Sequence, residues 1–325
     1  MTGHGDRVYR VGDWVRVRSA REILDTLDQA NELSGLPFMP EMLQYCGKTF
    51  RIRSSAHKTC DAVGSIRRME DAVHLDLRCD GSGHDGCQAG CLLFWKTQWL
   101  HPADGPDDAA PSAQSSAPED WAALLATTRS RVPGHYRCQA TEILRATSDV
   151  RRRDRWNPGL YVRDLTSGNV SVREFVTFGL IAAMNAFTER WFGWRYPRVR
   201  GLAKASAPPA ELHLQPGELV RVRSKVEILR TLNAERRNRG LWFDGEAVPY
   251  CGSSGRVLRR VERLIDEKTG AMIHLKTAAV IIDGMECGGK FSSARMFCPR
   301  AIYPYWREAW LERLQSDHSS PKPTV

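Results

Sequence analysis

Polar and apolar residues alternate in two short stretches of the chain that carry the same letters. The run VRVR begins at Val15 and again at Val220, and its period of two predicts a strand with one buried and one exposed face. In each stretch a serine follows, and a glutamate stands three residues later, as Ser19 and Glu22 do in the first. This capping-box spacing predicts a short helix directly after each strand.

The two stretches belong to a longer internal duplication. Residues 12–47 and 217–252 align without a gap, and half of the aligned positions are identical. The match resumes further along each copy, where the corresponding pairs are Cys87 and Cys298, Trp95 and Trp306, and Trp99 and Trp310. Each repeated unit spans roughly 90 to 100 residues, about the size of one small domain. The sequence therefore predicts two copies of one module.

The rest of each copy consists of short apolar runs rather than long helical ones. Alternating segments such as HLDLRC and AVIIDGMEC predict further short strands. Short strands around an early helix-bearing loop favour a small barrel, and the opening of each copy resembles an SH3-like barrel. This resemblance concerns the fold alone and implies no function. We therefore expect an α+β protein of two homologous small β-barrel (SH3-like) modules joined by a helical insert.

Changes in composition divide the chain further. We expect a first barrel module with the cysteine-rich segment at 8–101, a flexible linker at 102–118, a helical insert at 119–204, a second barrel module at 212–314 and a disordered tail at 315–325. The linker assignment rests on PADGPDDAAPSAQSSAP, which is rich in Pro, Ala, Ser and Asp and has no apolar period.

The longest predicted helix lies in the insert. The segment SVREFVTFGLIAAMNAFTERWF opens at Ser171, with Glu174 at the capping-box position. We expect this helix to pack in the interior, as a clasp between the two modules. The alternative is an interfacial or membrane helix, but the uncharged run from Phe175 to Thr188 is too short to cross a bilayer.

Length and charge narrow the class of protein. The 325 residues contain no run of 18 apolar residues and the first ten have no hydrophobic signal core, so we expect a cytoplasmic protein without a membrane partner. The formal charge of +9 suits an anionic partner such as nucleic acid. An ordinary basic surface explains the charge equally well, because the arginines are spread along the chain.

Nine cysteines are the strongest chemical signal. Disulfides are not expected in a reducing compartment, which leaves metal ligands, buried thiols or a catalytic cysteine. The dense segment CDGSGHDGCQAGC has glycines that would let several thiolates converge on one ion. Zinc is the default for such a site, and an iron–sulfur cluster uses the same ligands. The candidate metal ligands are Cys46, Cys60, Cys79, His84, Cys87, Cys91, Cys251, Cys287 and Cys298.

The duplication separates these candidates into shared and unshared ones. The shared cysteines are Cys46 with Cys251, Cys79 with Cys287, and Cys87 with Cys298, whereas Cys60 and Cys91 fall opposite Ile265 and Ile302. A fourth ligand is available in the first copy from Cys60, His84 or Cys91. The second copy has none unless His274 folds in, so we expect the first copy to hold the metal and the second to have lost it.

Two functional hypotheses stay open. The first is a metal-stabilised binding or accessory protein of tandem barrels that recognises an anionic partner such as nucleic acid. The second is an enzyme that uses the cysteine cluster, as a catalytic metal or iron–sulfur site, to modify a small molecule or a carried intermediate. The paired tryptophans in FWKTQWL and YPYWREAWL, four apart as on one face of a helix, predict core packing or a base-stacking surface. No phosphate-binding loop, nucleophile elbow or HExxH motif occurs in the sequence.

Overall fold

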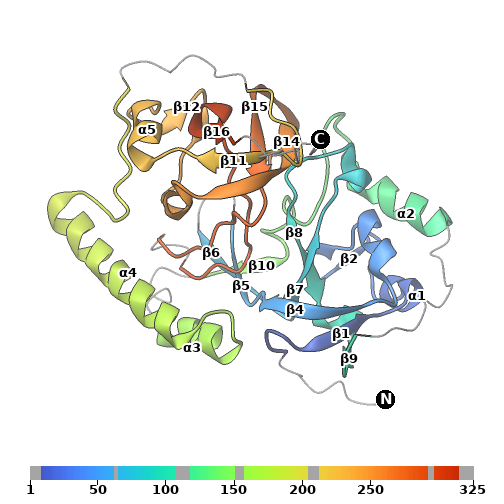
Figure 1. The fold of residues 1–325 in the computed structure, drawn as a ribbon. Helices are drawn as coiled ribbons and strands as arrows, with labels where there is room; N and C mark the ends of the chain where they lie inside the picture. The colour runs from blue at the N-terminus through green and yellow to red at the C-terminus, as the bar shows by residue number, and fades with distance from the viewer. Residues whose placement is uncertain are drawn as a thin grey trace, which may run out of the picture. The chain divides into compact units, whose positions relative to one another are not determined.

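Figure 1 shows the fold in a computed structural model, in which residues 9–61, 65–106, 118–150, 157–203, 212–291 and 296–314 are described. The chain divides into two compact units. Unit 1 comprises Met1–Tyr196, Arg263–His274 and Cys287–Ile302, and unit 2 comprises Pro197–Glu262, Leu275–Glu286 and Tyr303–Val325. The module boundaries inferred from composition stay a prediction. Most of the expected linker and all of the expected tail lie outside the described residues.

The protein is mixed α+β, and its sheets are curled, antiparallel and barrel-like. The strands of unit 1 are β1 (Trp14–Val17), β2 (Glu32–Leu33), β3 (Leu36–Pro37), β4 (Thr49–Ser55), β5 (Lys58–Cys60), β6 (Ile66–Met69), β7 (Ala72–Arg78), β8 (Leu92–Lys96), β9 (Leu100–Ala103) and β10 (Thr147–Asp149). Its larger sheet has the order β8-β7-β4-β1-β9, and a smaller one has the order β10-β6-β5. The strands β2 and β3 pair separately as a hairpin.

Short helices connect these strands, and longer ones follow them. They are α1 (Ala20–Leu24), α2 (Pro118–Thr128), α3 (Pro158–Thr166), α4 (Val172–Phe192) and the 3-10 helices η1 (Pro40–Tyr45), η2 (Ser82–His84) and η3 (Thr97–Trp99). Helix α1 begins as the sequence predicts, because the Ser19 hydroxyl accepts from the amide of Glu22 and the Glu22 side chain accepts from the amide of Ser19. The strand before it is also confirmed, since Val15 and Val17 are buried while Arg16 is exposed.

The core of unit 1 is built around two buried tryptophans. Trp95 lies in β8 and Trp99 in η3, so the expectation of a single helix carrying both is wrong. A strand that runs into a 3-10 turn brings residues four apart to the same side, which is why the spacing alone did not distinguish the two structures. Phe38 meets the Trp99 ring edge-to-face at 5.3 Å between centroids, and the Trp99 indole nitrogen donates to the Thr26 hydroxyl at 3.1 Å. These tryptophans are therefore core residues and not a stacking surface.

Unit 2 begins with the same series of elements as unit 1, a strand, a short helix, a two-stranded hairpin and a 3-10 helix, and it has fewer strands after them among the described residues. Its elements are β11 (Leu219–Val222), α5 (Lys225–Arg230), β12 (Arg237–Asn238), β13 (Leu241–Trp242), η5 (Gly245–Tyr250), β14 (Ser254–Ile265), β15 (Met272–Ile282), η6 (Glu308–Trp310) and β16 (Leu311–Arg313), and the ends of β14 and β15 fall within unit 1. The main sheet has the order β15-β14-β11-β16. Its core repeats the packing around Trp99 in unit 1. The ring centroids of Phe243 and Trp310 lie 5.2 Å apart, and the Trp310 indole nitrogen donates to the Thr231 hydroxyl at 2.8 Å.

Helix α4 begins and ends as its sequence indicates, but its burial differs from the expectation. Ser171 and Glu174 form the capping box, and Gly193 ends the helix in the left-handed region at φ 66°. One side packs on unit 1 through Phe175, which stacks on Phe297. The opposite side is exposed, so the interpretation of α4 as a helix enclosed in the core is wrong for half of its surface. Among the described residues, no helix is long and apolar enough to cross a membrane.

Candidate metal site

Three side chains from separate elements of unit 1 converge in its interior. Glu41 comes from η1, Cys79 directly follows β7, and His84 ends η2. The Cys79 amide donates to the carbonyl of Cys91 at 2.8 Å, which fixes the thiol at the base of the β7–β8 loop. The loop then turns back on itself, so that His84 returns to the level of Cys79.

Two glycines allow this loop to fold tightly. Gly81 has φ +84°, and a Cβ there would lie 2.2 Å from the carbonyl oxygen of Cys87, so no larger residue fits without moving the backbone. A Cβ on Gly83 would lie 2.4 Å from Oε2 of Glu41, so this glycine lets the loop press against η1. The hydroxyl of Thr128 in α2 donates to the Gly83 carbonyl at 2.7 Å and holds the loop from the other side.

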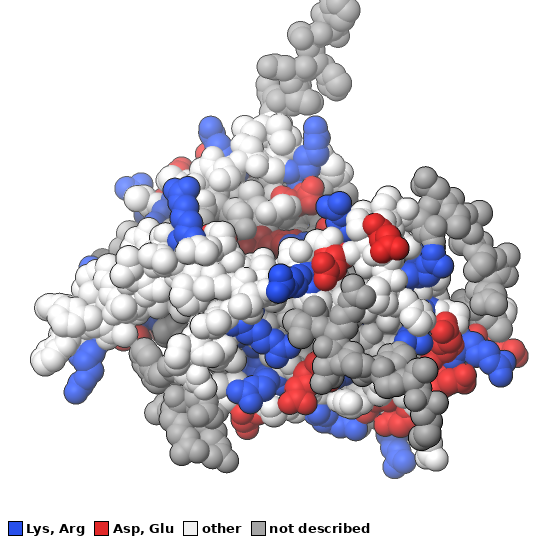
Figure 2. All heavy atoms as spheres, turned by 90° about the horizontal axis from the view of Figure 1, so that it is seen from below, with Lys and Arg blue, Asp and Glu red and all other residues white. Residues whose placement is uncertain are grey.

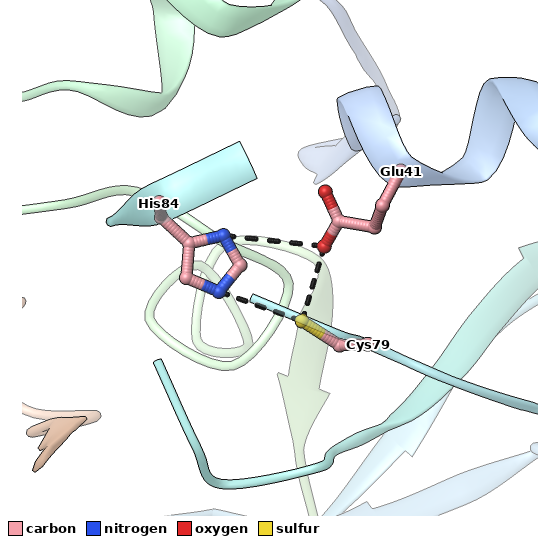
Figure 3. Close-up of side chains that lie close together, drawn as sticks. All are labelled: Glu41, Cys79 and His84. Carbon is pink, nitrogen blue, oxygen red and sulfur yellow. Dashed lines mark hydrogen bonds and ion pairs between the residues drawn. The ribbon is translucent and has the colours of Figure 1, made fainter. Parts of the chain in front are cut away.

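Figure 3 shows the three side chains pointing at one another. The Cys79 Sγ lies 3.0 Å from Oε1 of Glu41 and 3.4 Å from Nε2 of His84, and Nδ1 of His84 lies 3.9 Å from the same carboxylate oxygen. One ligand atom from each residue falls within 4.8 Å of the others. The three side chains are between 1% and 9% exposed, so bulk water is excluded from the space they share.

A bound cation would change which protonation states of the three side chains are favoured. Burial raises the pKa of the Glu41 carboxyl and of the Cys79 thiol, and it lowers the pKa of His84 to about 4. Without a cation, burial therefore favours three neutral groups. A divalent ion reverses this preference for the acid and the thiol, because it stabilises carboxylate and thiolate directly.

Two polar atoms of the site have no hydrogen-bond partner among the described residues. They are Oε2 of Glu41 and Nδ1 of His84, and both are buried. A buried polar atom left without a partner costs roughly 1–3 kcal/mol, and unsatisfied atoms of this kind call for an explanation such as an ion. An ion bound through Oε2 and Nδ1 would satisfy both atoms, whereas an ion bound through Oε1 and Nε2 would leave them without a partner.

The donor set and its spacing suit zinc. Sulfur, imidazole nitrogen and carboxylate oxygen are its usual protein ligands. Sulfur and nitrogen on one tetrahedral zinc ion lie roughly 3.5 Å apart, and the observed distance from Sγ to Nε2 is 3.4 Å. The 3.0 Å from Sγ to the carboxylate is that of a thiol hydrogen bond. Glu41 would have to shift outward by roughly half an ångström to bind the same tetrahedral ion.

The triad includes two of the nine residues named from the sequence, Cys79 and His84. No disulfide joins any of the nine cysteines, all of which lie among the described residues. The Cys46 and Cys251 thiols lie outside the triad, and burial raises their pKa values to about 12 and about 11. Cys251 belongs to unit 2, whereas Cys287 and Cys298 fall in unit 1.

The other five candidates lie in unit 1 outside the triad. The Cys298 Sγ accepts from the Cys60 amide at 3.1 Å, and Cys287 lies close enough to raise the pKa of Cys298 further. The Cys87 Sγ accepts from the amide of Ile265 at 3.4 Å. His274, the residue considered as a fourth ligand of the second copy, is exposed. Which of these thiols bind metal stays a prediction.

Sequence reasoning missed two residues of the site. Glu41 supplies the carboxylate, and the only signal for it was its identity with Glu246 in the duplication. Cys138 was not considered, because it lies outside both copies. Its thiol is close enough to Cys79 to raise the pKa of Cys79, as is that of Cys91. These two thiols are thus the ones whose charge acts on Cys79.

A second buried polar cluster lies between β5 and α3. Lys58 forms an ion pair with Asp164, and His57 places Nε2 3.3 Å from the other oxygen of the same carboxylate. The Lys58 ammonium also lies 4.9 Å from the centre of the Tyr161 ring. Burial lowers the pKa of Lys58, while Asp164 opposes this shift. The Lys58 ammonium balances the Asp164 carboxylate, while Nε2 of His57 and Oδ1 of Asp164 are buried without a hydrogen-bond partner among the described residues.

Charge on the surface is mixed in sign. On the face drawn in Figure 2, Lys and Arg side chains are interspersed with Asp and Glu. In unit 2, Arg221 pairs with Glu312 and Arg313 pairs with Glu218. The +9 formal charge is therefore not gathered into one basic area on that face. Among the described residues, the triad of Glu41, Cys79 and His84 is the one group of such side chains close enough together to hold a metal ion. Comparison with protein-family models, with curated proteins and with solved structures found no match.

Proposed function

We propose that unit 1 holds a zinc ion between Glu41, Cys79 and His84, and that the protein is a metal-stabilised binding or accessory protein of two barrel-like modules. The observation that carries the proposal is the convergence of three buried donors, with one ligand atom from each within 4.8 Å of the others. A fourth ligand would come from water or from a thiol nearby, such as Cys91 or Cys138.

The position of the site favours a structural role for the ion. It would join η1 to the β7–β8 loop, two segments that lack a shared strand pairing. Structural zinc sites are closed, whereas catalytic ones keep a position open to substrate. The near-complete burial of the triad fits the closed kind. The enzymatic hypothesis needs an accessible site, and the triad offers none in this conformation.

An anionic partner such as nucleic acid remains part of the proposal and rests on net charge alone. The retention of the protein on immobilised nucleic acid should then fall steeply as salt rises, because each phosphate contact releases counterions. Retention that is absent at low salt would contradict this part and leave the metal site untouched.

Metal analysis tests the site itself. Protein purified anaerobically without chelators should contain about one equivalent of zinc and no visible absorption band. The variants Cys79→Ser and His84→Gln should lose the metal, and Cys251→Ser, a matched thiol removal in unit 2, should keep it. Metal-free wild-type protein with normal secondary structure would refute the proposal. A visible band with bound iron would instead support the iron–sulfur alternative.

A further inference from the structure

One side of α4 presents a continuous apolar ridge to solvent. Its exposed residues recur at helical spacing, and we call them the α4 ridge: Val176, Leu180, Met184, Phe187 and Trp191. Leu180 and Trp191 are 68% and 70% exposed, and Phe187 is 58% exposed. Residues three or four apart share one face of a helix. The ridge therefore runs along most of the helix, over roughly 22 Å at 1.5 Å per residue.

The ridge is exposed although the helix is anchored. On the opposite side, Phe178 packs edge-to-face on Phe291, with 5.5 Å between the ring centroids. At the beginning of the helix, Nζ of Lys290 lies 2.9 Å from Oε1 of Glu174. The inner side of α4 is thus already packed on unit 1. The ridge is a separate face, on which none of the described residues packs closely enough to bury these side chains.

The area of the ridge matches that of a protein interface. Val172, Phe192 and Trp194 extend it at the two ends, and they are 70%, 66% and 36% exposed. Large side chains have areas of roughly 150–250 Å², so the eight together expose on the order of 900 Å² per chain, against ~800 Å² per partner in a standard interface. Monomeric proteins rarely expose an apolar patch of more than a few hundred Å².

We propose that the α4 ridge is the contact by which two copies of this chain associate as a two-fold dimer. A two-fold axis brings a surface against itself, so the surface must not repel its own copy. The α4 residues from Phe175 to Thr188 include no charged side chain, so the centre of the ridge meets this condition. Antiparallel pairing of two α4 helices would cover the ridge along its whole length.

A lipid surface is the competing occupant, and the construction of α4 disfavours it. Helices that lie in a bilayer interface have a strongly charged polar face opposite the apolar one. Here the opposite face carries Phe175 and Phe178, and it is packed on the protein. The cations nearest the ridge lie at its ends, at Arg173 and Arg190, and not along its flank.

Light scattering coupled to size-exclusion chromatography tests the proposal with the full chain. The wild type should elute at twice the mass of one chain, and this mass should persist at high salt because the contact is apolar. The double variant Leu180→Glu/Phe187→Glu should be monomeric, with a dissociation constant raised by about 30-fold or more. Ala186→Glu is the matched control, because this exposed residue lies about 100° around the helix from Phe187, and it should remain dimeric.

Circular dichroism and zinc content show whether the double variant is folded, and both should equal those of the wild type because its changes lie on exposed positions. A monomeric wild type would overturn the proposal, and a double variant that stays dimeric would also overturn it. A monomeric wild type that co-sediments with phosphatidylglycerol vesicles would identify the ridge as a lipid-binding face instead. The oligomeric state is independent of the zinc site, so either proposal can fail alone.

Discussion

Removing Asp164 should destabilise the protein by an amount that depends on pH. In the folded protein Lys58 and Asp164 are both fully buried and form an ion pair. The variant Asp164→Leu leaves Lys58 without a carboxylate in a position where water cannot solvate its charge. A buried, unpaired ammonium is costly enough that the lysine gives up its proton instead.

The size of the loss in folding stability follows from the proton that Lys58 gives up. Keeping a lysine neutral at pH 7.5, when its unfolded pKa is about 10.4, costs about 4 kcal/mol. This agrees with the roughly 3–5 kcal/mol expected when one partner of a buried pair is removed. In the variant the folded pKa of Lys58 lies below the unfolded one, so the unfolded state binds the extra proton. Stability should therefore rise with pH, by about 1.4 kcal/mol per unit up to pH 10.

Urea denaturation followed by circular dichroism, at pH 7.5 and pH 9, measures this effect. The penalty of Asp164→Leu should shrink to about 2 kcal/mol at pH 9. The double variant Lys58→Met/Asp164→Leu should recover most of the loss and show no such slope, because it buries no charge. Asp76→Asn, which alters an exposed pair with Arg53, should cost less than about 1 kcal/mol. A penalty that is the same at both pH values would refute the reasoning.

Two further predictions concern buried residues of unit 1. Burial lowers the pKa of His74 to about 3, so the unfolded state takes up a proton first and stability should fall by about 2 kcal/mol between pH 7 and pH 5. His74→Asn, whose amide can still donate to the Leu93 carbonyl, should lack this contribution in urea titrations; an unchanged pH dependence would contradict the assignment. Gly83→Ala should lower the zinc content, because the new Cβ would lie 2.4 Å from Oε2 of Glu41. Gly105→Ala, whose Cβ would have no neighbour within 4 Å, should leave the zinc content unchanged. Equal zinc in both variants would show that the close approach of this loop is not needed.

Local structure was predictable from the sequence where residues close together in the chain determine it. The capping boxes at Ser19 and Ser171 form as expected, because a serine followed three residues later by glutamate satisfies amides of the first turn without help from distant residues. The alternation in VRVR likewise fixed which face of β1 is buried. These structures depend on neighbouring residues only, so tertiary contacts do not change them.

Features that depend on distant residues were not predictable. The sequence indicated Cys79 and His84 but not Glu41, because the carboxylate reaches them from η1, about 40 residues earlier in the chain. The orientation of α4 was also undetermined, since apolar residues surround the helix and its sequence does not specify which side is packed. Tertiary contacts with Phe291 and Phe297 make that choice.

X-ray absorption at the zinc edge is the measurement that decides whether the triad binds the ion, because it reports the ligands of the ion in the intact protein. We expect one sulfur at about 2.3 Å and nitrogen or oxygen ligands at about 2.0 Å, with a second sulfur only if Cys91 or Cys138 supplies the fourth ligand. A shell of three or four sulfurs would contradict the Glu41, Cys79 and His84 site and move the metal to the neighbouring thiols.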